Sequence, residues 1–98
     1  MKLLAHGLID ELARKAAASP RARAHHNIHE SASDPVQRFL VVAQRSSYFR
    51  PHRHLTKSEL AMVLRGQVAV LTFDEAGTVT ARYSVGADAG SMAFDRAL

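Results

Sequence analysis

The chain contains no cysteine and no tryptophan, and its aromatic side chains are limited to four Phe and two Tyr. Without cysteine it can form neither a disulfide nor a thiolate metal site, which fits a reducing compartment, and we expect a cytoplasmic location. Charged residues near the N-terminus, such as Asp10 and Arg14, interrupt the apolar run too early for a secretory signal peptide. No apolar run approaches the length of a membrane span, so we expect no membrane partner.

The formal net charge is +4 at pH 7, but the basic residues are scattered along the chain. Nucleic-acid binding proteins usually combine a clustered basic surface with aromatic residues, so we expect no nucleic-acid partner. The arginines suit an anionic small molecule instead, because a guanidinium group binds phosphate and carboxylate in a bidentate manner. The chain also lacks a nucleophile elbow, a phosphate-binding loop and a dinucleotide fingerprint.

Hydrophobic periodicity predicts a mostly β domain with an N-terminal α-helix. Residues 8–18 place their apolar side chains on one helical face, and Ser19 and Pro20 end the helix. Residues 21–35 are polar and without period, which is typical of a loop or an extended arm. Short apolar runs with turn signals between them predict a β-sandwich or barrel. The predicted strands are 36–44, 48–54, 59–64, 68–73, 79–85 and 91–94, and the predicted division is an arm of residues 1–35 and a β core of residues 36–98.

One stretch concentrates metal-binding chemistry. His52 and His54 are two residues apart, so in an extended strand their imidazoles point to the same side. Glu59 lies five positions after His54, and Gly66 lies seven positions after Glu59. Two imidazoles and a carboxylate suit Zn, Fe, Mn or Ni, and three protein ligands leave positions open for water or substrate. Glu59 shares its predicted strand face with Ala61 and is expected to point inward, where an unpaired charge would be costly.

This stretch resembles the first motif of the cupin superfamily, in which a glycine, His-x-His, a glutamate and a second glycine recur at this spacing. Ser46 stands at the position of the first glycine. Three further short segments are similar to those of WbuC-type cupin-fold metalloproteins: Asn27-Ile28-His29, residues 34–38 and residues 50–54. The resemblance implies a double-stranded β-barrel of the jelly-roll type. The second cupin motif, which supplies another metal-binding His, does not occur in these 98 residues, so we expect an incomplete jelly roll or a truncated form.

The resemblance and the chemistry together nominate a set of site residues. The metal ligands would be His52, His54 and Glu59, around one divalent transition metal. His29 and Glu59 would act as general acid or base. The residues expected to bind substrate are Asn27, Arg38, Tyr48 and Arg50.

Simpler interpretations stand beside these assignments. His52 and His54 could be solvated residues of an edge strand, and Glu59 could pair with Arg53 or Lys57. His29 could anchor a loop through hydrogen bonds to the backbone, and any single arginine is most often a solvated charge.

The predicted function is therefore a metal-dependent protein that acts on a small molecule. The resemblance implies a sugar or sugar nucleotide of polysaccharide or O-antigen metabolism, and the arginines suit an anionic derivative. An isomerase, epimerase or oxygenase reaction fits a metal site of this kind. The alternatives are a non-catalytic module that binds a small ligand, and a truncated inactive remnant. An incomplete barrel would leave an open apolar sheet edge, which invites pairing with another chain, so we also expect a homodimer.

Overall fold

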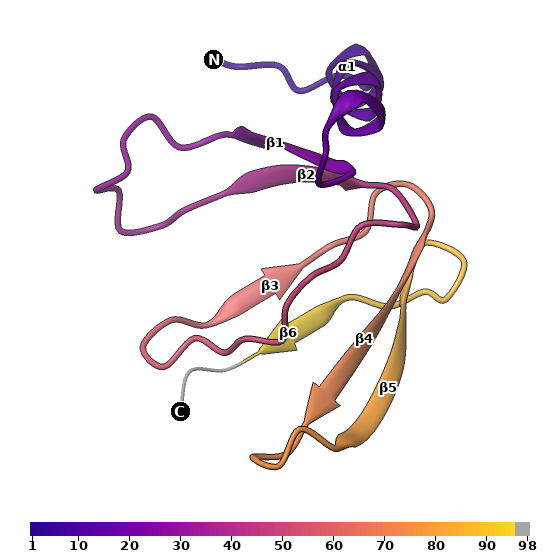
Figure 1. The fold of residues 1–98 in the computed structure, drawn as a ribbon. Coiled ribbons are helices and arrows are strands. Elements are labelled where there is room, and N and C mark those ends of the chain that lie inside the picture. Colours follow the sequence, from indigo (N-terminus) through magenta and orange to yellow (C-terminus); the bar gives the residue numbers. More distant parts are fainter. Residues whose placement is uncertain (96–98) are drawn as a thin grey trace. The chain divides into compact units, whose positions relative to one another are not determined.

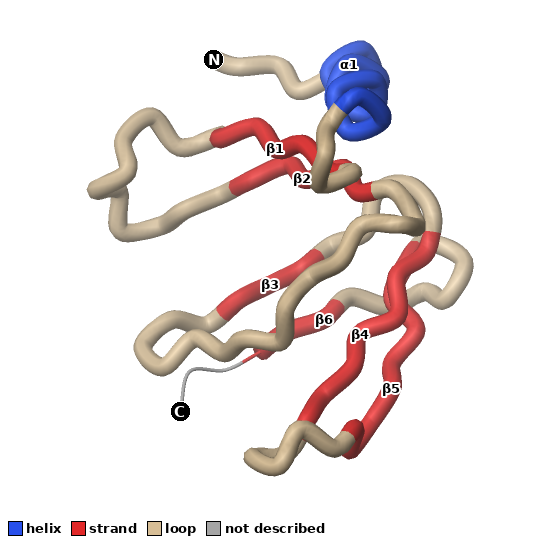
Figure 2. Tube along the Cα trace, viewed as in Figure 1, coloured by secondary structure: helices blue, strands red, loops and turns tan. Residues whose placement is uncertain are grey.

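The computed structural model describes residues 1–95 and contains one helix and six short strands (Figures 1 and 2). It divides into two compact units, Met1–Phe49 and Arg50–Leu98. The predicted class, mostly β with one N-terminal helix, is confirmed. In chain order the elements are α1 (His6–Ala18), β1 (Arg23–Asn27), β2 (Phe39–Ala43), β3 (Glu59–Ala61), β4 (Gln67–Phe73), β5 (Val79–Gly86) and β6 (Ala93–Asp95).

The helix α1 forms where the sequence predicts it and begins two residues earlier, at His6. Its alanines favour the helical state, and Glu11 and Lys15 form an ion pair of 3.3 Å one turn apart. Leu12 and Ala16, four residues apart on one face, are buried. The helix contacts both β1 and β2, so this face anchors α1 to the first hairpin. No helix within residues 1–95 has the length and apolar character needed to cross a bilayer.

The segment expected as a loop or arm contains a strand. β1 pairs antiparallel with β2 in a five-residue register that runs from Arg23 opposite Ala43 to Asn27 opposite Phe39. β1 has little apolar alternation of its own, so backbone pairing with its apolar partner decides its conformation. The predicted division between residues 35 and 36 stays a prediction, while the contacts place β1 and β2 together in Met1–Phe49.

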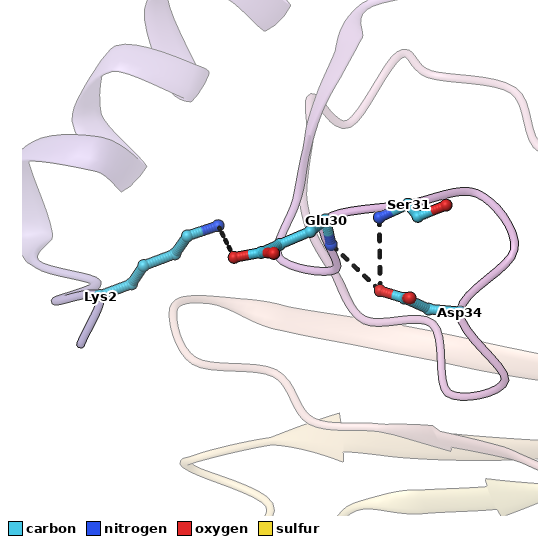
Figure 3. Close-up of polar contacts among 4 residues, drawn as sticks. All are labelled: Lys2, Glu30, Ser31 and Asp34. Atoms are coloured by element: carbon cyan, nitrogen blue, oxygen red, sulfur yellow. Dashed lines mark hydrogen bonds and ion pairs between the residues drawn. The ribbon is translucent and has the colours of Figure 1, made fainter.

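The polar residues between β1 and β2 are ordered by local hydrogen bonds (Figure 3). The Asp34 carboxylate accepts from the backbone N–H groups of Glu30 and Ser31 at 3.1 and 3.3 Å. Glu30 in turn lies 3.8 Å from the Lys2 ammonium group. A short acidic side chain that binds nearby backbone in this way stabilises a turn, which explains why the segment needs no apolar period.

The predicted strand over residues 48–54 is wrong, because this segment has no regular secondary structure. Pro51 in its middle lacks a backbone N–H and so cannot donate to a sheet ladder. Tyr48 and the two histidines therefore do not share a strand face. The remaining predicted strands are present. Two of them differ in their bounds: the strand predicted over 59–64 is Glu59–Ala61, and the strand predicted over 91–94 is Ala93–Asp95.

In the second unit, β4 and β5 form a hairpin and β3 pairs with β6, both antiparallel. The hairpin turn is built as the sequence predicts. Asp74 Oδ1 accepts from the N–H groups of Ala76 and Thr78, both at 2.9 Å, and Gly77 takes a left-handed conformation with φ of 83°. Among residues 1–95 the strands form three two-stranded sheets and no closed barrel.

Burial is confined to a few side chains of the described residues. The buried apolar residues are Leu12, Ala16 and Val85, and many large apolar side chains on the strands are exposed. Val68 and Val85 face each other on one side of the β4–β5 hairpin, and Leu71 and Phe73 point to the other side. Both faces of this hairpin are therefore apolar, which is typical of strands covered on two sides.

The Gly66–Gly86 contact is a point where a side chain cannot be added without displacement. A Cβ built on Gly86 would lie 2.8 Å from the Gly66 carbonyl oxygen, and Gly86 has φ of 156°. We therefore expect Gly86→Ala to lower the free energy of unfolding by at least about 1 kcal/mol, measured by urea denaturation followed by circular dichroism. Gly7→Ala is the control, because its new Cβ meets nothing within 4 Å inside a helix and should raise stability by up to about 1 kcal/mol. Equal stability of the two variants would contradict the close approach.

Candidate metal centre

His52 and His54 lie in the irregular segment that precedes β3, and their rings are adjacent. The ring centroids are 5.1 Å apart and the ring planes meet at 85°. His52 Nδ1 lies 3.0 Å from the Arg50 carbonyl oxygen. A carbonyl oxygen only accepts, so Nδ1 carries the proton and Nε2 of the neutral ring keeps its lone pair. This backbone contact leaves His52 in the tautomer that a metal ion binds through Nε2.

His54 and Glu59 form the central contact of the site. His54 Nε2 lies 2.9 Å from Glu59 Oε2, and the two side chains are 42% and 55% exposed. The expectation that Glu59 points inward is wrong, since Glu59 is exposed at the start of β3. β3 is three residues long and, within residues 1–95, pairs with β6 alone in a two-stranded sheet. Glu59 therefore avoids the cost of a buried charge through water and His54.

The distance between these two atoms fits two chemical states. At 2.9 Å, a protonated Nε2 donates a hydrogen bond to the carboxylate. Two ligand atoms bound at about 2.1 Å and at a right angle to each other around one metal ion are also about 3 Å apart. A divalent ion could thus replace the shared proton with little movement of either side chain.

The ligand types of His52, His54 and Glu59 suit a metal ion, and two of these side chains, His54 and Glu59, are already in contact. Within residues 1–95, no three His, Asp or Glu side chains gather around a single point. His52 is exposed and its ring is adjacent to that of His54, and its Nε2 would have to turn toward the His54–Glu59 pair to complete a set of three ligands. Two histidines and a carboxylate would then supply three ligands to a divalent transition metal, with open positions toward solvent.

The neighbouring charges leave the His54–Glu59 pair intact. Arg53 donates to Glu75 at 2.7 Å, across to the β4–β5 turn. The simpler interpretation paired Glu59 with Arg53, but Arg53 pairs with Glu75 and Glu59 contacts His54. An exposed ion pair of this kind adds little to stability.

The residues predicted to bind substrate are all exposed, and they fall in different units. Asn27, Arg38 and Tyr48 belong to Met1–Phe49, and Arg50 belongs to the unit that contains His52. The Tyr48 carbonyl oxygen accepts from Arg23 at 2.8 Å, and Arg50 contributes its own carbonyl oxygen to His52. Their roles with substrate stay predictions.

His29 is the one buried polar side chain among the described residues, with 8% of its surface exposed. Its Nδ1 lies 3.2 Å from the backbone nitrogen of Arg38 and 3.0 Å from the carbonyl oxygen of the same residue. In either neutral tautomer Nδ1 is engaged, because it accepts from the N–H or donates to the carbonyl. The ring also packs edge-on against Phe39, at 5.0 Å between centroids. Only Nε2 remains for the acid or base role that the sequence predicts.

One acidic residue that the sequence interpretation did not single out lies beside the site. Asp95 is directly opposite Glu59 in the β3–β6 pairing. The predicted strand ended at residue 94, one residue short of it. The alternation of Ala93, Phe94 and Asp95 was the only local signal, and it says nothing about which strand is the partner.

A shallow hollow of about 280 Å³ lies elsewhere in the same unit. Met62, Met92 and Gly86 are among its lining residues. Met62 and Met92 follow β3 and precede β6, at the end of this strand pair away from Glu59. The hollow has no titratable lining residue, so it lacks the acid, base and metal-ligating groups that His52, His54 and Glu59 supply.

Comparison with known proteins gives one match. The model of a protein family described as a domain of unknown function matches residues 4–85, which is most of the chain. No curated protein and no solved structure matches.

The burial of His29 predicts a stabilising role for this residue. We expect His29→Ala to lower the free energy of unfolding by roughly 1–3 kcal/mol, because it removes the partner of the Arg38 backbone in a poorly hydrated position. Thermal and urea unfolding of the variant would measure this. His25→Ala, an exposed histidine on β1, is the matched control and should cost less. A His29→Ala protein with unchanged stability would contradict the anchoring role and favour the catalytic one.

Proposed function

The chain belongs to the DUF6016 family, a domain of unknown function, and from its own residues we propose that it is a metal-binding protein that acts on a small molecule. The metal would be one divalent transition ion held by His52, His54 and Glu59. The observation that supports this most directly is the 2.9 Å separation of His54 Nε2 and Glu59 Oε2, with the His52 ring alongside.

The proposal includes a cupin-type jelly roll as the complete fold. Its support is the His-x-His pair, the glutamate at the required spacing, and Gly66, which has a left-handed φ of 82° at the turn into β4. Only glycine adopts this conformation at little cost, which explains a glycine at the end of the motif. The antiparallel strands with two apolar faces also suit a double-layered barrel.

The chemistry follows from the two side chains that touch. A bound divalent ion would supply Lewis acidity toward a carbonyl or hydroxyl oxygen, or would activate a water. Independently of the ion, the pair places His54 Nε2 and Glu59 Oε2 2.9 Å apart at the surface, a distance at which the two atoms can share a proton. Such a pair can accept a proton from one atom of a substrate and return it to another, which is the basis of isomerisation and epimerisation. An oxygenase reaction is the other class that such a ligand set serves.

The substrate class rests on charge and on the family resemblance. Arg50 is exposed two residues before His52, and its guanidinium group is suited to a phosphate or carboxylate. An anionic sugar derivative, such as a sugar nucleotide, has both such a group and the hydroxyl or carbonyl oxygen that a metal ion would bind.

We also propose that the protein is a homodimer, with a second copy covering exposed apolar strand faces. Many large apolar side chains of the described strands are exposed, among them Val68, Leu71 and Phe94, and large exposed apolar patches are unusual for a monomer. The expected result of light scattering at increasing protein concentration is a mass of two chains, and Leu71→Glu on β4 should shift it toward one. A monomeric mass for the parent at high concentration would contradict this proposal.

Metal content tests the site itself. Protein purified without chelator and without a polyhistidine tag should contain about one divalent ion per chain by elemental mass spectrometry. The variant His52→Ala/His54→Ala should lose it, because one carboxylate alone binds such an ion weakly.

The matched control is His25→Ala/His26→Ala, which removes the same number of imidazoles from β1. It should keep its metal. If the folded parent stays free of metal after incubation with Zn²⁺, Fe²⁺, Mn²⁺ and Ni²⁺, the metal proposal fails and binding of a small ligand without metal becomes the better interpretation.

A further inference from the structure

We propose that Asp95 is a further ligand of the same metal ion and takes the place of a third imidazole. This inference rests on the proposed function, and it names a residue that lies 41 positions after His54 in the chain. It would give the centre two imidazoles and two carboxylates, from three different segments of one unit: the irregular segment, β3 and β6.

The β3–β6 register brings Asp95 to the site. Glu59 pairs with Asp95, Leu60 with Phe94 and Ala61 with Ala93, in an antiparallel arrangement. Residues directly opposite each other in such a pair project to the same face, with their Cβ atoms about 5 Å apart. Asp95 therefore stands on the face of Glu59, and Glu59 is the residue that contacts His54.

The two carboxylates of the Glu59–Asp95 pair would be stabilised by a cation. Two like charges directly opposite each other in an antiparallel pair repel and destabilise it. Here both members of the terminal pair, Glu59 and Asp95, are carboxylates. A divalent ion between them would turn this repulsion into attraction, since it presents two positive charges to two negative ones.

The side chains are free to make the required movement. His52, Glu59 and Asp95 are exposed, and among residues 1–95 no three metal-ligating groups yet meet at one point. The backbone positions set by the register bring the groups within reach, and rotation of exposed side chains would complete the site. Formation of the full ligand set would then accompany metal binding.

The second carboxylate also predicts which metal is favoured. Imidazole ligands suit Zn²⁺ and Ni²⁺, whereas carboxylate oxygens suit harder ions such as Mn²⁺. Exchange of an imidazole for Asp95 should therefore raise the affinity for Mn²⁺ relative to Ni²⁺. The variant Asp95→His should reverse this preference.

The test is calorimetric titration of the full chain with Mn²⁺ and, separately, with Ni²⁺. Asp95→Asn should weaken Mn²⁺ binding by at least about tenfold, since replacement of a group that only supports a ligand already costs that much. Asp95→His should weaken Mn²⁺ binding but retain Ni²⁺ binding. Asp88→Asn, which removes one exposed carboxylate from the turn after β5, is the matched control and should leave both affinities unchanged.

The melting temperature without metal separates a ligand from a structural residue. Asp95→Asn should melt at the same or a higher temperature than the parent, because it removes the repulsion with Glu59, while the rise in melting temperature on adding Mn²⁺ should shrink. Unchanged Mn²⁺ affinity in Asp95→Asn, or a lower melting temperature without metal, would overturn the role of Asp95 and leave the proposed function standing. A parent that binds neither ion would overturn both.

Discussion

Antiparallel backbone pairing decides which side chains can meet in this protein. Each of its three sheets has two strands, so each is held by a single ladder of hydrogen bonds. The β3–β6 ladder is three residues long, and its terminal pair is Glu59 and Asp95. A slip of one residue would move Asp95 to the other face, because side chains alternate along a strand. The arrangement of acidic groups at the candidate site thus depends on this register.

Hydrophobic packing contributes unequally to the two units. In Met1–Phe49, α1 covers one side of the β1–β2 hairpin through Leu12 and Ala16, and a buried His29 secures the loop beyond it. In the second unit, Val85 is the buried apolar residue among those described, and large apolar side chains on both faces of β4–β5, such as Val68 and Leu71, are exposed. A two-stranded hairpin is marginally stable by itself in water, so these faces gain stability from whatever covers them. This is the physical basis for proposing a second copy.

Exposure also shapes the chemistry of the candidate centre. A hydrogen-bonded His–Glu pair in contact with water is weakly held, so a metal ion competes mainly with one shared proton and with solvent. The contact between His52 Nδ1 and the Arg50 carbonyl oxygen leaves His52 Nε2 available to the proposed metal ion. Ligands presented in this way allow binding at low cost, but enclosure by further protein or by substrate is needed before electrostatic effects on a reaction become large.

Local features were predictable from the sequence because neighbouring residues determine them. The helical period of residues 8–18 and the turn between the predicted strands 68–73 and 79–85 each depend on contacts within a few positions, and both are present. The spacing of His52, His54 and Glu59 likewise placed two of these groups in contact.

Tertiary structure decided the features that depend on a distant partner. β1 is a strand because β2 pairs with it, whereas residues 48–54 pair with no strand of the described chain and are irregular around Pro51. Glu59 is exposed and not inward-facing, at the start of a strand of three residues. Asp95 meets Glu59 only through the register of two strands more than thirty residues apart. The sequence by itself determined the donor types and the local turns. Pairing between distant strands decided which donors share a face, because backbone hydrogen bonds form between any residues and only the folded chain selects their register.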